Sequence, residues 1–195
     1  MNDTARAQVA GWQNIVDATH SRLQDAGQWP PVERGLTEQE KAAARAIFGN
    51  SLNLDAIQVN DDSFLGAVKE DNAISTPGVI NFPPGTLSKN DPRYLPWLMH
   101  ELTHQWQYQH GYRLDQLAVA AAAGNYDYGG DDGLRAATAQ GKGIESFNFE
   151  QQGDIVRNYY LRKTQGGNTS AFDPFIQQIQ ANGPDLQAPP DWPPP

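Results

Sequence analysis

The spacing of apolar residues predicts two helices near the start of the chain. Over residues 5–25 apolar side chains recur at helical spacing, so an amphipathic helix is expected there. A second helix is expected to begin at Thr37, because Thr37 and Glu40 form a capping box, in which each side chain satisfies a backbone N–H of the other residue. Gly49 is well placed to end this helix. We interpret both helices as scaffold.

Alternation of apolar and polar residues predicts a small sheet in the next part of the chain. Residues 54–59 alternate in the manner of a half-buried strand. Residues 78–82 are predicted to form a second strand, which Pro83-Pro84-Gly85 would end. A further short strand is proposed over residues 73–75.

The second half of the chain is predicted to be mainly helical. Pro96 suits the first turn of a helix that ends near Gly111. Asn148 and Gln151 form a second capping box, at the start of a helix that runs to Leu161. Other segments are assigned as helices over 114–123, 134–140 and 174–181, and as extended polyproline II over 187–195. The polar segment 125–133 does not match the spaced ligands of an EF-hand, so we expect a solvated loop rather than a calcium site.

These elements predict an α+β fold that is mostly helical, with a small sheet next to the helix that begins near Pro96. A length of 195 residues suits one domain with a sizeable core. Residues 1–35 are interpreted as an N-terminal helix and linker, residues 36–183 as the compact domain, and residues 184–195 as a proline-rich tail.

Composition and charge narrow the functions open to this chain. The net charge of −9 argues against a polyanionic partner such as nucleic acid. Nothing approaches a membrane span of about 20 apolar residues. The first residues lack the charged and apolar regions of a secretory signal, which predicts either a cytoplasmic protein or export by a route without a cleaved signal peptide. Cysteine is absent, so a zinc site must use His, Asp or Glu.

The segment His100-Glu101-Leu102-Thr103-His104 carries the clearest chemistry in the sequence. On a helix, residues four apart share a face, so His100 and His104 can offer two imidazole nitrogens to one ion. Zinc accepts that arrangement and keeps a position open for water. Glu101 is close enough to take a proton from that water without filling a metal site. The pattern H-E-x-x-H therefore predicts a zincin with Glu101 as general base.

A catalytic zinc needs a third protein ligand, and two residues compete for that role. His110 stands six residues after His104, as in the metzincin pattern, but that pattern needs glycine where this chain has Gln107. A helix that continued without a turn would carry His110 about 240° round from His104. Glu150 is the other candidate, on a second helix, with Asp154 four residues later on the same face.

H-E-x-x-H with a later E-x-x-x-D, here Glu150 to Asp154, resembles the gluzincins, the thermolysin-like branch of zinc metallopeptidases. The resemblance implies a zincin-like domain in which Glu150 is the third ligand to Zn²⁺. It also implies that Asp154 orients His100 through the second ring nitrogen, as carboxylates beside a metal site commonly do. In zincins an edge strand shortly before the metal helix lines the cleft and can pair with an extended peptide. Residues 78–82 form either that strand or a strand with a purely structural role, and the sequence does not separate the two.

A wider stretch, roughly residues 36–162, resembles uncharacterised bacterial zincin-like proteins that are associated with type VI secretion spikes or polymorphic toxins. The segments that carry this resemblance are Leu36-Thr37-Glu38, Asn81-Phe82-Pro83-Pro84-Gly85 and Trp97 through Trp106. This resemblance implies a partner in a secretion apparatus or toxin system.

The expected function is that of a zinc metallopeptidase, a metalloendopeptidase that acts on a peptide or protein substrate. Its oxyanion needs a further donor. The sequence does not rank the candidates for that donor, which are Arg157, Tyr159, Tyr160, Tyr112 and His110. An ion pair between Asp154 and Arg157 is the plainer role for Arg157.

Two alternatives stay open. One is a catalytically idle zincin-fold adaptor or scaffold of a secretion or toxin system, and the other is a zinc hydrolase of other amides or esters. Glu101 argues against the idle scaffold, because a structural zinc needs no base beside its ligands.

Overall fold

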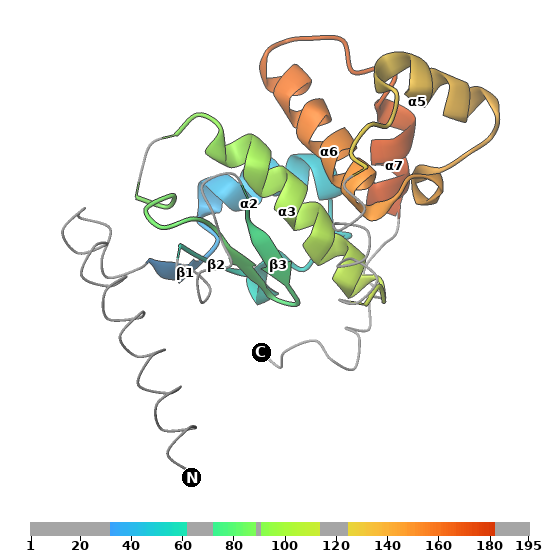
Figure 1. The fold of residues 1–195 in the computed structure, drawn as a ribbon. Coiled ribbons are helices and arrows are strands. Elements are labelled where there is room, and N and C mark those ends of the chain that lie inside the picture. Colours follow the sequence, from blue (N-terminus) through green and yellow to red (C-terminus); the bar gives the residue numbers. More distant parts are fainter. Residues whose placement is uncertain (1–31, 62–71, 89–90, 114–124, 182–195) are drawn as a thin grey trace, which may run out of the picture.

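The structure, a computed structural model, describes residues 32–61, 72–88, 91–113 and 125–181 (Figure 1). The helices predicted over residues 5–25 and 114–123 and the tail over residues 184–195 lie outside the described residues. No helix among the described residues combines the length and hydropathy that a membrane span needs.

The described strands form a four-stranded sheet in the order β1-β2-β4-β3. Strand β2 pairs with β4 in parallel, and the β1–β2 and β3–β4 pairs are antiparallel. The strand bounds are Glu33–Gly35 (β1), Gln58–Asn60 (β2), Ile74–Thr76 (β3) and Val79–Asn81 (β4). The predicted strand over residues 78–82 is β4, and the short strand proposed over residues 73–75 is β3.

The strand predicted over residues 54–59 is wrong at its start. Leu54–Ala56 forms a 3₁₀ turn (η1), and β2 begins only at Gln58. Leu54 and Ile57 are both buried, which is the three-residue spacing of a helical turn rather than the alternation of a strand. Strand β1 was not predicted, since only its pairing with β2 makes these three residues a strand.

The described helices are α2 (Glu38–Phe48), α3 (Tyr94–Gln109), α5 (Gly130–Ala139), α6 (Phe149–Thr164) and α7 (Asp173–Ala181), with a 3₁₀ turn η2 (Ile144–Ser146). Both predicted capping boxes are confirmed, at Thr37 with Glu40 and at Asn148 with Gln151. The α+β class, mostly helical with a small sheet, is confirmed as well.

Helix α5 begins earlier than predicted and takes in the end of the segment that was expected to be a loop. Asp131 and Asp132 lie in its first turn, where a helix N-terminus favours negative charge. Asp131 also pairs with Arg162 of α6, at 2.6 Å between Oδ1 and Nη2. The aspartates therefore begin a helix and hold it against α6.

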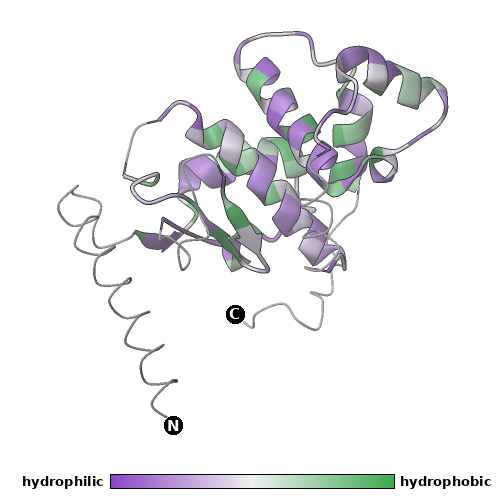
Figure 2. Cartoon of the chain, viewed as in Figure 1, coloured by the Kyte–Doolittle hydropathy of each residue, from purple (hydrophilic) through white to green (hydrophobic). Residues whose placement is uncertain are grey.

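Helix α3 is the central element, because it packs along α6 on one side and against β3 on the other (Figure 1). Its apolar residues Leu98, Met99 and Leu102 are fully buried and belong to the same core cluster as Ile155 and Val156 of α6. Figure 2 shows that α3 also carries hydrophilic residues. These are buried too, and they are His100, Glu101, Thr103, His104, Gln105, Gln107 and Gln109. A buried polar face of this size requires partners for every group.

A partly buried ion pair holds the start of α2 to β1. Glu40 accepts hydrogen bonds from both terminal nitrogens of Arg34 at 2.8 Å, and from the Tyr94 hydroxyl at 2.7 Å. Burial by itself would raise the pKa of Glu40, but these bonds and the Thr37 N–H bond lower the pKa below its usual value.

Glu40→Gln is therefore expected to lower the free energy of unfolding by about 1–3 kcal/mol at pH 7, because it leaves Arg34 without its charge partner. The folded-state pKa of Glu40 is depressed, so its contribution is present above the ordinary value of 4.5 and is lost as the pH falls through the folded-state pKa. Urea unfolding of both proteins at pH 7 and pH 3 measures this. An equal difference at the two pH values would contradict the interpretation.

Candidate metal centre

Three predicted ligands come together between α3 and α6. His100 and His104 lie one turn apart on α3, and Glu150 lies in the first turn of α6. All three are buried. The group of His100, His104 and Glu150 could bind a metal ion, because each residue offers one ligand atom to a common point.

The distances among these ligand atoms fit a tetrahedral ion. Nε2 of His100 lies 3.2 Å from Nε2 of His104 and 3.2 Å from Oε2 of Glu150. Nε2 of His104 lies 3.5 Å from the same Glu150 oxygen. Ligands about 2.0–2.2 Å from a tetrahedral zinc lie about 3.3–3.6 Å apart, from the geometry of the tetrahedron. The three atoms thus form one face of such a tetrahedron.

Each histidine is held through its other ring nitrogen. Nδ1 of His100 lies 2.9 Å from Oδ1 of Asp154, and Nδ1 of His104 lies 2.8 Å from Oε1 of Gln107. Both partners are acceptors, so both Nδ1 atoms donate a proton. In neutral histidine this leaves Nε2 as a lone-pair donor that faces the shared centre.

The electrostatics of the centre favour a cation. Burial by itself would lower the pKa of His100, but hydrogen bonds to Asp154 and Glu150 and the charge of Glu101 raise the pKa to about 9. Burial by itself would raise the pKa of Glu150, but hydrogen bonds with His100 and His104 hold the pKa well below its usual range. A proton or a metal ion is therefore needed to balance these electron-rich atoms.

Gly153 lets α6 come this close to His100. A Cβ atom at this position would lie 2.7 Å from both Cε1 and Nδ1 of the His100 ring, which is shorter than any real contact. Glycine inside a helix lowers stability by about 1 kcal/mol relative to alanine. Its presence between Glu150 and Asp154 is explained by the close packing of α6 against His100. The sequence shows that signal, but it was not used in predicting the site.

Glu101 is held by the edge of the sheet. The Ser75 hydroxyl donates to Oε2 of Glu101 at 2.8 Å, and the Tyr108 hydroxyl donates to the Ser75 carbonyl at 2.9 Å. Ser75 lies on β3, the edge strand of the described sheet that contacts α3, whereas β4 lies inside the sheet. Of the two interpretations of residues 78–82, the structural strand therefore holds, because β4 is not at an edge. Its hairpin partner Ile74–Thr76 takes the place at the edge, and neither Ser75 nor Tyr108 was predicted at the site.

The structure also places the candidate oxyanion donors. Arg157 pairs with Asp154 at 3.0 Å, the plainer role considered for it. His110 follows the last residue of α3 and its Nδ1 lies 2.6 Å from the Trp106 carbonyl of its own helix. The remaining candidates have contacts that do not involve the metal ligands: Tyr159 with Lys163 and Phe172, Tyr112 with Phe149. Tyr160 is half-buried on α6.

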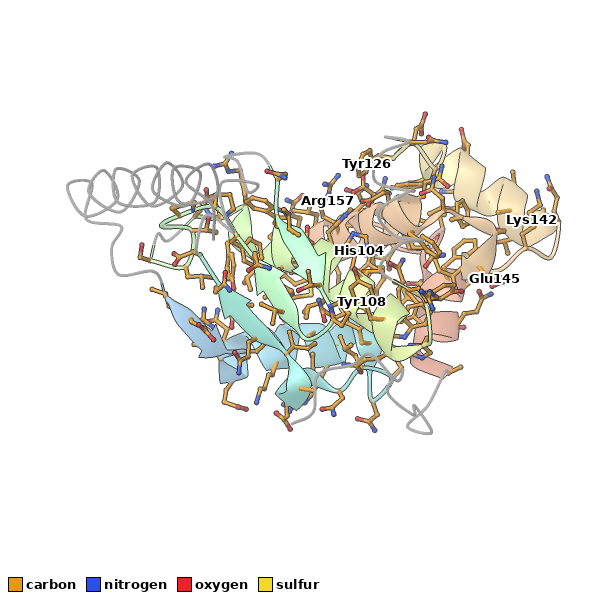
Figure 3. The ribbon with its side chains drawn as sticks, turned by 60° about the horizontal axis from the view of Figure 1, so that its bottom comes forward. His104, Tyr108, Tyr126, Lys142, Glu145 and Arg157 are labelled. Carbon is orange, nitrogen blue, oxygen red and sulfur yellow. The ribbon has the colours of Figure 1, made fainter. Side chains whose placement is uncertain are left out.

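Tyr126 is a residue of the site that the sequence did not single out. Its ring centroid lies 6.4 Å from that of His100, and it is 42% exposed. Figure 3 labels Tyr126 in the same part of the molecule as Arg157 and His104. Burial, the charges of Glu150, Asp154 and Glu101, and a hydrogen bond to Glu150 raise the pKa of Tyr126. Its hydroxyl therefore stays protonated and able to donate a hydrogen bond.

Comparison with known proteins shows which proteins this chain resembles in sequence and fold. No family model matches the chain. The type VI secretion system spike protein VgrG2b of Pseudomonas aeruginosa is 30% identical over 147 residues, which are 73% of this chain and 14% of that spike protein. The solved effector domain of Pseudomonas aeruginosa VgrG2b aligns with a TM-score of 0.56 and 27% identity, over 86% of this chain and 97% of that domain.

The chain is thus homologous to the effector domain of a type VI secretion spike protein. It spans 14% of the length of the whole spike protein that it matches. The similarity is to the effector portion of that spike, since nearly all of the solved domain is covered.

Proposed function

We propose that this protein is a zinc-dependent metallopeptidase that acts as a type VI secretion effector. The observation that carries the proposal is the set of three ligand atoms, 3.2–3.5 Å apart, on His100, His104 and Glu150. A bound zinc ion would supply a Lewis acid that polarises a peptide carbonyl and lowers the pKa of water. Such chemistry needs a base beside the metal, and Glu101 fills that position.

The role of Glu101 is to move a proton. Its carboxylate is held at Oε2 by the Ser75 hydroxyl, which fixes its orientation on the side of α3 that carries the edge strand. From there Glu101 accepts a proton from the attacking water and passes it to the leaving amine. The edge strand β3 lies against α3 and offers a place for an extended peptide.

Ser75→Ala is expected to lower kcat about 10- to 100-fold, because a hydrogen bond to a charged group is worth about 1.5–3 kcal/mol. Zinc content should be unchanged, since Ser75 contacts no metal ligand. Ser75→Thr keeps the hydroxyl and should restore most of kcat. Steady-state kinetics on one peptide measures all three proteins, and a Ser75→Ala variant with wild-type kcat would show that the serine is incidental.

Tyr126 is proposed as the donor to the developing oxyanion, because its protonated hydroxyl lies at the metal ligands. Tyr126→Phe should then lower kcat by about 10²-fold with little change in KM, the usual cost of one oxyanion donor. Arg157→Gln serves as the comparison for the earlier candidate, whose guanidinium is paired with Asp154. A larger loss of kcat in Arg157→Gln than in Tyr126→Phe would reverse the assignment.

The secretion partner is proposed from the homologous spike protein, of which the matching domain is one part. We infer that this chain travels on or with a spike of the type VI apparatus. The substrate would then be a peptide or protein that it meets after delivery.

The proposal is tested by digesting a broad peptide library with purified protein of known zinc content. About one zinc per chain and peptide cleavage that stops on chelation are expected. Full zinc with cleavage of simple amides or esters but no peptide would favour the non-peptidase hydrolase. Full zinc with no hydrolysis of any kind would favour the adaptor.

A further inference from the structure

A chain of amide groups runs from the second metal histidine to the start of α6. Gln107 accepts at Oε1 from Nδ1 of His104 at 2.8 Å. Its Nε2 donates to the Phe149 carbonyl at 3.0 Å and to Oε1 of Gln152 at 2.9 Å. Nε2 of Gln152 in turn donates to the Phe147 carbonyl at 2.9 Å. Gln107 and Gln152 are buried, so water does not compete for these bonds.

The backbone carbonyls of Phe147 and Phe149 fix the direction of every hydrogen bond in this network of amide groups. The Phe147 and Phe149 carbonyls can only accept, so both glutamines must point their NH₂ groups toward α6. Oε1 of Gln107 is then the atom that faces His104, and it can only accept. Nδ1 of His104 must carry the proton, and Nε2 is left to face Glu150 and His100. The two carbonyls thus determine the tautomer of a metal ligand on another helix.

We propose that Gln107 and Gln152 are positioning residues of the metal centre, which hold His104 in its metal-binding tautomer and lock the start of α6, with Glu150, against α3. This inference rests on the proposed zinc site. One side chain would set two of the three ligands, because Gln107 bonds His104 directly and reaches the peptide next to Glu150 through the Phe149 carbonyl.

The charge of the centre explains why an amide suits this position better than a carboxylate. Glu150, Asp154 and Glu101 already place three carboxylates around the two histidines. A glutamate at 107 would add a fourth, and its second oxygen would face the Phe149 carbonyl and Gln152 Oε1 without a proton to donate. Glutamine supplies the acceptor for His104 and the donor for α6 at once.

The helix provides a matched control. Gln109 lies two residues after Gln107 on α3 and is buried. It makes two hydrogen bonds with the backbone of Asn53, at 2.7 and 3.1 Å. It therefore resembles Gln107 in residue type, burial and bonding, but its bonds go to the loop before η1 instead of to the metal ligands. Gln109→Met should cost stability without changing the metal centre.

The test measures zinc affinity by competition with a chelator in wild type, Gln107→Met, Gln152→Met and Gln109→Met. Gln107→Met should bind zinc about 10- to 100-fold more weakly, as losses of partners behind a metal ligand do. Gln152→Met, which leaves the His104 contact intact, should show a smaller loss in the same direction. Gln109→Met should bind as wild type does. Unchanged affinity in Gln107→Met, or equal losses in Gln107→Met and Gln109→Met, would overturn the inference.

Nitrogen NMR of the histidine rings in the metal-free protein gives a second readout that needs no zinc. Wild type, Gln109→Met and Gln152→Met should show His104 with its proton on Nδ1, because the Phe149 carbonyl still directs the amide of Gln107 in all three. Gln107→Met should show a mixture of tautomers. A pure Nδ1–H form in Gln107→Met would overturn the inference, and so would a mixture of tautomers in wild type, which needs no variant to fold. Wild type without zinc affinity would instead refute the proposed zinc site, and the tautomers would still test the network of amide groups.

Discussion

Glu101→Gln is expected to abolish peptide cleavage while the protein keeps its fold and its zinc. The amide is nearly isosteric with the carboxylate and can still accept the Ser75 hydrogen bond, so the edge strand should not move. Glu101 is also not among the three ligand atoms that meet at the centre. A neutral amide cannot accept a proton from water, however, and general acid–base catalysis is worth about 10²- to 10⁴-fold.

The measurement is kcat of zinc-loaded wild type and Glu101→Gln on a peptide found in the library digest, with zinc content determined for both samples. Ser75→Thr, which alters the partner of Glu101 but keeps the base, is the control for small shifts at the edge strand. A Glu101→Gln variant as active as wild type would remove Glu101 from the reaction.

Glu150→Ala is expected to lose most of its zinc, and His110→Ala to keep it. Oε2 of Glu150 lies 3.2 and 3.5 Å from the two histidine nitrogens, so its removal leaves a two-ligand site. A catalytic zinc normally needs three protein ligands. His110 instead contacts the Trp106 carbonyl, and its ring lies 4.2 Å from the Trp106 ring.

Metal analysis after dialysis against a weak chelator distinguishes the two variants. Asp154→Ala should fall between them, at about 10- to 100-fold weaker binding, because Asp154 supports His100 without touching the metal. Zinc lost from His110→Ala but kept by Glu150→Ala would mean that α3 breaks near Gln107 in the metal-bound protein.

The sequence predicts those parts of the site that depend on the spacing of residues close together in the chain. His100 and His104 share a face because a helix repeats every 3.6 residues, and both capping boxes depend on residues three apart. The helix bounds at Thr37 and Asn148 followed from these rules alone. The α+β class followed from the change of hydrophobic period between the sheet and the helices.

Other parts depend on packing between distant segments, which no local pattern specifies. Ser75 meets Glu101 only because β3, rather than β4, is the edge of the sheet. Tyr126 lies beside His100 although it belongs to residues 125–129, the described segment just before α5, which is distant from His100 in the sequence. Strand β1 exists only through its pairing with β2.

Two further signals were present in the sequence but were not interpreted. Gln107 stands three residues after His104, a spacing at which helical side chains meet, so this spacing indicates a contact between the two side chains. Gly153 interrupts a helix between two functional carboxylates, which points to close packing at that turn. Both signals could have located the partners of the histidines.

A crystal of zinc-loaded protein, measured with X-rays on either side of the zinc absorption edge, tests the metal centre most directly. We expect one anomalous peak per chain, between Nε2 of His100, Nε2 of His104 and the Glu150 carboxylate, about 2.0–2.2 Å from each. A peak at another place on the chain, or a fully formed ligand cluster with no peak in saturating zinc, would contradict it.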